Sequence, residues 1–343
     1  MSMGAERDSE GTPAGKRGRR FLVTGASGFV GSHVVRELSK AGHEVIPMIR
    51  GTATPPALEP WAGAIRRASL QDPAALEKAV SGVDVVVHLG APTRARSEAE
   101  FMDTNAEGVA RLVTAVRAAN GELSRFVYVS SIAAGGPSSG ATPVREEDAP
   151  RPVSPYGRSK LAGETRLREN AGQVPWTILR PPLVYGPGER DLLMMFRSAA
   201  RGWVPLLGGG DRSYSIVHAR DLVAAIVAVT QSPGAAGQTY YVAEDRVYRG
   251  RDLLGHIAAA LGSKPRIVPV PRWIAAIVAS AGSGLKPIMK RPPFLTMDKL
   301  PELVENWVCS PDKLARDCGF RCGIPFDQGA AETAAWYRAE KWL

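Results

Sequence analysis

The sequence contains no apolar run of about 20 residues, the length that a membrane-spanning helix needs. The most apolar candidate, residues 273–279, is much shorter, and no signal-peptide core stands near the first residues. We therefore expect no transmembrane segment.

Cysteine is also scarce. The chain has three cysteines, Cys309, Cys318 and Cys322, and no histidine stands near them in the sequence. A small odd number without histidine partners argues against a disulfide framework and against a zinc site. We expect reduced thiols, no bound metal and a cytoplasmic location.

Acidic residues are fewer than basic ones, which gives a formal net charge of +9. The basic residues are scattered, and five of them lie within residues 7–20. A nucleic-acid-binding surface would need a clustered patch or a recognisable module, so we expect no nucleic-acid partner. Residues 1–18, rich in glycine, serine, glutamate, arginine and proline, are expected to form a flexible basic tail.

Short apolar segments alternate with amphipathic ones through the first half of the chain. Residues 83–89 form a nearly continuous apolar run, typical of a parallel strand buried on both faces. This alternation predicts an α/β fold with a Rossmann-type, doubly wound parallel sheet. The expected strands are 21–24, 44–49, 64–68, 83–89, 126–129 and 176–179, and the expected helices include 73–80, 100–119 and 155–170.

Beyond Arg180 the alternation loosens, and proline and glycine become frequent. We predict a dinucleotide-binding domain over residues 19–185, with a return segment at about 214–245. Residues 186–213 and 246–343 would form a smaller, mostly helical substrate-binding lobe. The later elements expected are helices at 189–201 and 220–230, a glycine turn at 208–210, and strands at 214–217 and 239–242.

The stretch from Phe21 to Gly31 is a short apolar strand followed by a glycine motif and an amphipathic run. Gly25 permits a tight turn, Gly28 lets the backbone approach a pyrophosphate, and Gly31 lets the helix pack closely on the strand. The N–H groups at the start of that helix favour a bound phosphate. The stretch therefore predicts a dinucleotide-binding site.

A second group of residues predicts acid–base chemistry. Tyr156 and Lys160 are four positions apart, so they lie on one face of the expected helix. An ammonium beside a phenol favours the phenolate, and we expect it to move the pKa of Tyr156 toward working pH. Ser131, at the end of strand 126–129, can present its hydroxyl to the same carbonyl oxygen. Together these residues predict a proton relay beside a hydride carrier, although each alone would commonly be a surface or capping residue.

Six motifs occur in order along the chain: Thr24-Gly25-Ala26-Ser27-Gly28-Phe29-Val30-Gly31, Asp84-Val85-Val86-Val87-His88-Leu89-Gly90-Ala91, Asn105-Ala106-Glu107-Gly108, Tyr128-Val129-Ser130-Ser131, Tyr156-Gly157-Arg158-Ser159-Lys160 and Arg180-Pro181-Pro182-Leu183-Val184-Tyr185-Gly186-Pro187-Gly188. On these motifs the chain resembles the extended short-chain dehydrogenases/reductases, the NAD(P)-dependent epimerase/dehydratase family. In style it is most similar to the 3β-hydroxysteroid dehydrogenases and dihydroflavonol reductases. The resemblance covers residues 21–188 and continues more weakly toward the C-terminus.

The resemblance implies roles for single residues. Tyr156 would be the acid/base, Lys160 would hold the nicotinamide ribose, and Ser131 would orient the substrate oxygen. Ser130 would face the cofactor. Asn105 would lie near the active site, although a purely structural role is equally open for it. The implied cofactor-binding residues are Gly25, Ser27, Gly28, Phe29, Val30, Gly31, Arg50, Ser69, Leu70, Leu89, Gly90, Ala91, Ser130, Tyr156, Lys160, Pro182 and Val184.

The choice of cofactor depends on the end of the second strand. An acidic residue there would bind the ribose 2′-hydroxyl, whereas this chain has Arg50. NADP(H) is therefore favoured over NAD(H), although a solvated surface arginine would give the same pattern. The chain also departs from the family where Ala68-Ser69 replaces the usual Gly-Asp, which leaves only a hydroxyl near the adenine.

Three functions stay open. The first is an NADP(H)-dependent carbonyl reductase or secondary-alcohol dehydrogenase acting on a small, largely hydrophobic molecule. The second is an NAD(P)-dependent nucleotide-sugar epimerase, and the third is a non-catalytic regulator that senses NADP(H). Sugar-nucleotide members resemble one another in having an asparagine where this chain has Pro181-Pro182, and dehydratases in having an Asp-Glu pair where it has Ile132 and Ala133. The first departure favours the reductase, and the second counts against a 4,6-dehydration.

The apolar residues within 273–289 would suit a hydrophobic substrate, or would form a core helix of the small lobe. The helices expected at 100–119 and 155–170 are those by which family members often dimerise. The resemblance therefore leaves a homodimer open.

Overall fold

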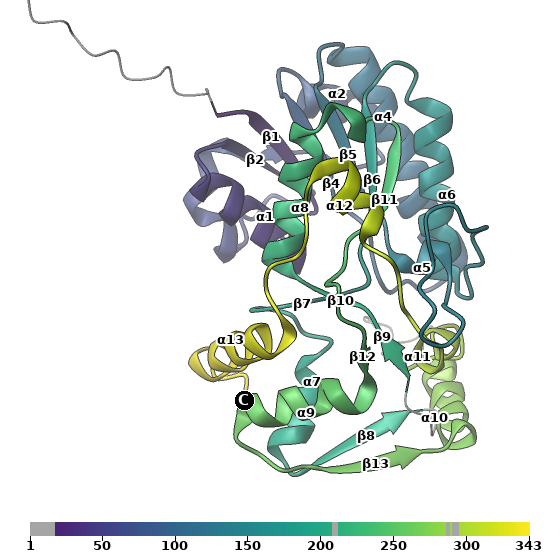
Figure 1. The fold of residues 1–343 in the computed structure, drawn as a ribbon. Coiled ribbons are helices and arrows are strands. Elements are labelled where there is room, and N and C mark those ends of the chain that lie inside the picture. The colour runs from purple at the N-terminus through teal and green to yellow at the C-terminus, as the bar shows by residue number, and fades with distance from the viewer. Residues whose placement is uncertain (1–17, 208–211, 286–288, 290–294) are drawn as a thin grey trace, which may run out of the picture.

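The computed structural model describes residues 18–207, 212–285, 289 and 295–343 (Figure 1). Residues 1–17 of the expected tail and the expected glycine turn at 208–210 lie outside the described residues. The centre of the fold is a sheet of seven strands in the order β11-β6-β5-β4-β1-β2-β3. All of its strand pairs are parallel, which confirms the predicted doubly wound sheet.

The strand order reverses between β1 and β4, so their following connections leave in opposite directions. Such a reversal opens a crevice at the carboxyl ends of the strands, where open α/β sheets bind ligands. The strands are β1 (Arg20–Thr24), β2 (Glu44–Ile49), β3 (Arg66–Arg67), β4 (Val85–His88), β5 (Arg125–Val129), β6 (Trp176–Arg180) and β11 (Gln238–Tyr241).

Helices cover both faces of the sheet (Figure 1). On one face, α1 and α8 pack with buried residues such as Val34 and Leu222 against the strands. On the other face, α2, α4 and α6 do so with residues such as Leu76, Leu112 and Leu167. These helices are α1 (Phe29–Lys40), α2 (Pro73–Val80), α4 (Gly108–Ala119), α6 (Pro155–Asn170) and α8 (Ala219–Gln231).

The expected helix at 100–119 is interrupted. It consists of α3 (Glu98–Met102), a single π-helical segment η2 (Asp103–Glu107) and α4. A π-helical turn inserts a residue into the helix and often marks a functional site. Short elements that the sequence did not predict are the 3₁₀ helices η1 (Pro56–Ala64) and η3 (Pro233–Ala235), and helix α5 (Ile132–Gly135).

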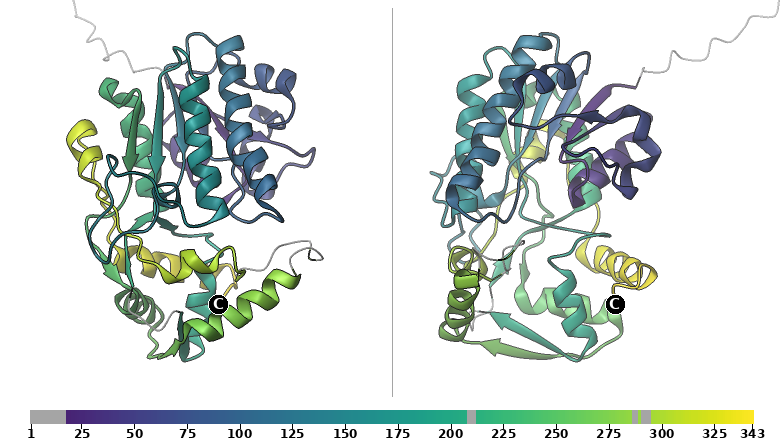
Figure 2. Two further views of the ribbon diagram at one scale, coloured as in Figure 1. Left: turned by 90° about the vertical axis from the view of Figure 1, so that its right-hand side faces the viewer. Right: turned by 180° about the vertical axis from the view of Figure 1, so that it is seen from behind.

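A second lobe lies below the carboxyl ends of the strands in Figure 1, and the side and rear views of Figure 2 agree. Its core contains Phe196, Ile257 and Tyr337, contributed by three different helices. The elements of this part are α7 (Leu193–Ala200), α9 (Gly250–Leu261), α10 (Arg272–Leu285), α11 (Leu300–Val304) and α13 (Phe326–Ala339), with the strand pairs β7 (Leu183–Tyr185) and β10 (Ile216–His218), β8 (Trp203–Leu207) and β13 (Arg266–Val270), and β9 (Ser213–Tyr214) and β12 (Tyr248–Arg249). Within the described ranges, no helix is long and apolar enough to cross a membrane.

Helix α12 (Asp312–Cys318) lies in the range expected to form the lobe, yet it packs against the sheet. Leu314 is buried in the same core as β1 and α8. Lys313 Nζ donates to Gln238 Oε1 at 2.9 Å and to the Thr239 carbonyl at 3.0 Å, beside edge strand β11. The chain therefore returns to the dinucleotide-binding half before ending in α13.

Candidate functional site

The turn between β1 and α1 requires glycine at two positions. Gly25 has φ +68°, in the left-handed region that favours glycine. A Cβ atom on Gly31 would lie 2.1 Å from the Gly25 carbonyl oxygen, so α1 starts in direct contact with the turn. The N-cap is Gly28, and no side chain caps the helix. Its first N–H groups therefore point outward from a twelve-residue helix, an arrangement that fits a diphosphate.

The end of β4 lies against this turn. The Leu89 N–H donates to the Thr24 carbonyl at 3.3 Å, and the Gly90 nitrogen would be 2.8 Å from a Cβ on Gly25. The carboxyl ends of β5 and β6 meet the same edge because the sheet is parallel. The predicted cofactor residues at this edge are Gly25, Ser27, Gly28, Phe29, Val30, Gly31, Leu89, Gly90, Ala91, Pro182 and Val184. Their contacts with a dinucleotide stay a prediction.

A second arginine lies beside the loop that starts at Arg50. Ile49 pairs with Arg67 between β2 and β3. The Arg67 guanidinium donates to the Gly51 carbonyl at 2.6 Å and to Thr54 Oγ1 at 3.2 Å. Two cations therefore flank the end of β2, and the sequence analysis identified only one of them.

The other two residues predicted near the adenine differ from each other. Ser69 is partly exposed, and its hydroxyl contacts the side chain of Gln71. The Leu70 side chain is buried in the core and would meet a Cβ placed on Gly108. Only the main chain of Leu70 is therefore available to a cofactor.

Tyr156 and Ser131 lie together, as the relay requires. Ser154 caps α6 by accepting the Gly157 N–H at 2.9 Å, which places Tyr156 in the first turn. The Ser131 hydroxyl lies close enough to the Tyr156 phenol to lower its pKa. Ser131 also caps α5 by accepting the Ala133 N–H at 3.1 Å. Its place at the start of a helix therefore fixes the direction of its hydroxyl.

The pKa of Tyr156 moves in the opposite direction from the expectation. Burial raises the pKa of Tyr156 well above its ordinary value, the Glu302 carboxylate raises it further, and only the nearby Ser131 hydroxyl opposes this. Lys160 does not lower the pKa of Tyr156 as expected, because its Nζ donates to the Val129 carbonyl at 2.8 Å instead. Burial also lowers the pKa of Lys160 to about 7, although Glu164 opposes it. A lysine that loses its charge near neutral pH stabilises a phenolate only weakly.

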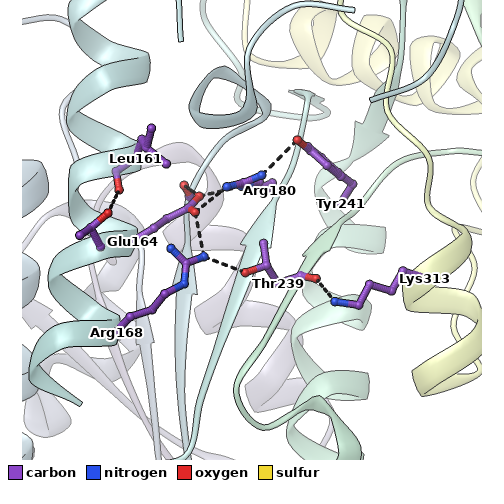
Figure 3. Close-up of polar contacts among 9 residues, drawn as sticks. Leu161, Glu164, Arg168, Arg180, Thr239, Tyr241 and Lys313 are labelled. Atoms are coloured by element: carbon purple, nitrogen blue, oxygen red, sulfur yellow. Dashed lines mark hydrogen bonds and ion pairs between the residues drawn. The ribbon is translucent and has the colours of Figure 1, made fainter. Parts of the chain in front are cut away.

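Glu164 is the centre of a buried charge network one turn beyond Lys160 (Figure 3). The Arg180 guanidinium binds both of its oxygens, with Nε to Oε1 at 2.8 Å and Nη2 to Oε2 at 2.7 Å. Arg168 donates to Oε2 at 3.2 Å, and Arg180 also contacts the Tyr241 hydroxyl at 3.2 Å. The network ties the helix that carries Tyr156 and Lys160 to strands β6 and β11.

Ser130 belongs to this network. Its buried hydroxyl donates to Glu164 Oε1 at 2.7 Å. The expectation that this side chain faces the cofactor is therefore corrected: successive side chains of an extended segment point to opposite sides, so Ser130 faces α6 while Ser131 faces the catalytic tyrosine.

Asn105 lies in the π-helical segment and is fully buried. Its Nδ2 donates to Ser159 Oγ at 2.9 Å, between the positions of Tyr156 and Lys160. Its Oδ1 is buried without a hydrogen-bond partner among the described residues. Asn105 therefore contacts the helix that carries the relay residues but not the relay residues themselves.

A cavity of about 30 Å³ adjoins Tyr156, which is room for little more than a water molecule. The second lobe covers it: the Ser154 hydroxyl donates to Glu302, and Arg94 pairs with Asp191. Burial raises the pKa of Glu302 and lowers that of Lys299. The lining residues are Thr93, Arg94, Ala95, Phe101, Ser154, Pro155, Tyr156, Thr296, Asp298, Lys299 and Glu302.

The apolar residues of 273–289 do not line this cavity. Trp273, Ile277 and Val278 are exposed, so they do not form a core helix either. Ile288 lies outside the described residues. Among the described residues, no group of three or more histidine, cysteine, aspartate or glutamate side chains is placed to hold a metal ion.

A sequence profile of the NAD-dependent epimerase/dehydratase family matches residues 21–243. The chain belongs to this family. The match begins at β1 and ends just after β11, so it covers the whole sheet and the relay residues. This confirms the resemblance to the extended short-chain dehydrogenases/reductases. As a family member the protein is an NAD(P)-dependent oxidoreductase.

Relatives extend the match beyond the sheet. A ceramide reductase of Caulobacter vibrioides is 29% identical over 323 residues, which cover 94% of this chain and 95% of the relative. A 2-alkyl-3-oxoalkanoate reductase of Stenotrophomonas maltophilia is 30% identical over 270 residues, covering 72% of this chain and 77% of the relative. The crystal structure of a UDP-glucose 4-epimerase from Thermotoga maritima has a TM-score of 0.76 at 23% identity, covering 94% of this chain and 99% of that one. At that identity the likeness concerns the fold alone.

The sequence analysis did not identify four charged residues near the candidate site of this family member. Glu164 carried a usable signal, because it lies four positions after Lys160 and therefore on the same helix face. Arg67 could have been found from its place in the expected third strand. Lys299 and Glu302 gave no signal, because more than a hundred residues separate them from Tyr156.

Proposed function

We propose that the protein is an NADP(H)-dependent carbonyl reductase or secondary-alcohol dehydrogenase. One observation carries the proposal: the Ser131 hydroxyl lies beside the Tyr156 phenol, which adjoins a cavity. Ser131 follows β5 and Tyr156 lies in the first turn of α6, while Gly25 and the open start of α1 follow the parallel strand β1. An acid, an orienting hydroxyl and a phosphate-binding turn at one edge are the parts that ketone reduction needs.

In this proposal, the ketone oxygen accepts hydrogen bonds from Tyr156 and Ser131. A bound nicotinamide supplies the hydride. Tyr156 gives its proton to the oxygen as negative charge develops there, and a phenol whose pKa is raised by burial is fully protonated for that step. Lys160 stands one turn further along α6, where a charged form would hold a ribose and stabilise the phenolate that remains after the proton has left. In the alcohol-oxidising direction the same proton travels from substrate to Tyr156.

The proposed substrate is a largely hydrophobic ketone with one polar or anionic end. The names of the two relatives above refer to a ceramide and to a 2-alkyl-3-oxoalkanoate. The cavity lining carries Arg94 and Lys299 together with Asp298 and Glu302, and these charged groups suit a polar end. A substrate that reaches Tyr156 would contact residues from 296 to 302, because Thr296, Lys299 and Glu302 line this cavity.

Tyr156→Phe tests the acid. We expect the rate of NADPH oxidation, followed at about 340 nm with a panel of ketones, to fall by roughly 10²- to 10⁴-fold. Binding of NADPH should survive, and a thermal-shift measurement would show this as retained stabilisation by the cofactor. A variant that turns over at the wild-type rate would remove Tyr156 from the mechanism.

The preference for NADP(H) rests on Arg50 with Arg67 beside it. A 2′-phosphate between two guanidinium groups would gain charge-assisted hydrogen bonds that a 2′-hydroxyl lacks. We expect Arg50→Ser to raise the KM for NADPH by about tenfold and to leave the KM for NADH nearly unchanged. Equal changes in both KM values would mean that Arg50 does not distinguish the two cofactors.

A nucleotide-sugar epimerase is the second candidate, and it is favoured by the fold that the chain shares with the UDP-glucose 4-epimerase structure described above. The buried Pro181 and Pro182 count against it, since neither offers a polar side chain. An epimerase would interconvert UDP-sugars without net change in cofactor absorbance, so the ketone assay separates the two. A non-catalytic sensor would bind NADPH and turn over neither substrate class.

A further inference from the structure

Helix α10 shows the reverse of the usual arrangement of a surface helix. Its inner face carries small residues, with Ala275, Ala279 and Gly282 buried against the protein. Its outer face carries bulky apolar residues, with Trp273 64% and Ile277 62% exposed. A surface helix of a globular protein normally buries its large apolar side chains. The outer face of α10 is therefore built for an apolar partner outside the chain.

The apolar face continues at both ends of the helix. Val278 is half exposed beside Ile277, and Met297, also exposed, is tied to the helix by its N–H, which donates to Ser283 Oγ at 2.9 Å. Strand β13 leads directly into α10 and carries exposed Val268. In the side view of Figure 2, α10 runs along the surface of the second lobe, away from the sheet.

Basic residues predominate around this face, where the Arg272 guanidinium also lies 3.8 Å from the Glu305 carboxylate. The sequence contains no aspartate or glutamate from residue 253 to 297, whereas it contains six lysines and arginines there. Three of these, Lys264, Arg266 and Arg272, are exposed in the described part of the chain. Exposed tryptophan and isoleucine on a helix rimmed by basic residues are the pattern of an amphipathic helix that lies in a membrane interface.

We propose that α10 and strand β13 dock the protein onto an anionic lipid bilayer. The helix has 14 residues, whereas a helix that spans a bilayer needs about 20. In this proposal it therefore lies along the membrane interface, with Trp273 and Ile277 inserted among the acyl chains. Lys264 and Arg266 then face the anionic headgroups. The proposal goes beyond the catalytic function and holds or fails without it.

A second copy of the chain fits this face less well. A two-fold dimer is isologous, so the patch would meet itself and bring Lys264 and Arg266 of the two copies near one another. Like charges at a dry interface are unfavourable, whereas an anionic surface neutralises all of them.

Helix α10 is also connected to the candidate site. Arg272 Nη2 donates to the Val304 carbonyl at 3.2 Å, and Val304 is the last residue of α11. The same short helix carries Glu302, which lines the cavity beside Tyr156.

The test is flotation of the full chain, without substrate or cofactor, with two kinds of vesicle. One kind contains phosphatidylcholine alone, and the other also contains about 30% phosphatidylglycerol. We expect the chain to float with the anionic vesicles only and to be released by about 0.5 M NaCl. Ile277→Glu should weaken binding roughly ten- to hundredfold, because it removes the isoleucine that inserts into the bilayer and places a negative charge against the anionic surface.

Met194→Glu is the matched control, since Met194 on α7 is 61% exposed, nearly the same as Ile277. It should leave vesicle binding unchanged. Lys264→Glu tests the electrostatic part separately and should lower binding to anionic vesicles. A wild-type chain that stays in the lower fractions with anionic vesicles would overturn the proposal. So would equal losses in Ile277→Glu and Met194→Glu, or a dimer in light scattering that Ile277→Glu converts to a monomer without any vesicle binding.

Discussion

In helices α6 and α10, the burial of side chains departs from their polarity in opposite directions. The sequence of α6 is strongly polar, yet Ser159, Lys160 and Glu164 on it are almost completely buried. The sequence of α10 is mostly apolar, yet Trp273 and Ile277 are exposed. Real proteins depart from consistent patterning mainly at functional sites. The comparison therefore separates a helix held by internal polar contacts from one whose apolar face lacks a partner within the described chain.

The first helix depends on its buried charges being paired. Glu164 and Arg180 lie on opposite sides of the gap between α6 and β6, and each is nearly free of solvent contact. A buried ion pair adds little net stability compared with apolar residues, but losing one partner leaves an uncompensated charge inside the protein. Removing one buried charge from α6 should therefore lower the free energy of unfolding far more than any substitution on the outer face of α10.

The largest expected effect is that of Glu164→Gln. The amide cannot balance the charge of Arg180 and presents donor hydrogens toward other donors, so we expect the free energy of unfolding to fall by about 3–5 kcal/mol. Urea denaturation with an unchanged m-value would measure it. Glu169→Gln on the same helix is the control, because Glu169 pairs with Arg166 at the surface and should cost less than about 1 kcal/mol. Equal costs would show that burial of the charge is not the cause.

The inner face of α10 should give the next largest effect. Ala279 is fully buried against the lobe, and Ala279→Leu would force extra methylenes into a packed contact at a cost of about 1–3 kcal/mol. Ile277→Glu on the outer face should change the free energy of unfolding by less than about 0.5 kcal/mol. Thermal or urea unfolding of the two variants compares the faces directly. A larger loss for Ile277→Glu would mean that the outer face is packed within the chain.

Lys160→Met should change the pH dependence of stability. Burial lowers the pKa of Lys160 from 10.5 to about 7, so between these pH values the unfolded chain holds a proton that the folded chain has lost. The free energy of unfolding contributed by Lys160 therefore rises with pH across this interval, by up to about 1.4 kcal/mol per pH unit. Below the interval both states are protonated and the cost of burying the charge is fully present.

The methionine variant lacks this dependence. Its stability advantage over the wild type should be greatest near pH 6 (roughly) and should shrink steadily toward alkaline pH. Urea midpoints of the two proteins across the interval would measure the difference. A difference that does not vary with pH would mean that Lys160 keeps its proton in the folded protein.

Much of the fold followed from local patterns. The glycines at 25 and 31 and the apolar run at 83–89 predicted a parallel, doubly wound sheet because strand burial and helix starts leave strong local signals. Tyr156 and Lys160 could be paired from their spacing alone. The break in the helix around Asn105 could not, since a π-helical turn depends on which neighbours it must reach.

The remaining errors arise where distant segments meet. The pKa of Tyr156 is raised partly by Glu302, which a different lobe brings to it. The Ser130 hydroxyl turns toward Glu164 because a strand end and a helix face each other across the sheet surface. The domain limits, the homodimer and the cytoplasmic location stay predictions.

Ser154, the N-cap of α6, makes two hydrogen bonds through one hydroxyl group, one with its oxygen and one with its hydrogen. Ser154 Oγ accepts the Gly157 N–H through a lone pair, while its hydrogen is shared with Glu302. Withdrawal of the carboxylate therefore removes no hydrogen bond from the first helical turn. Tyr156, two residues further on, is therefore aimed by a hydrogen bond within α6 that does not depend on the second lobe.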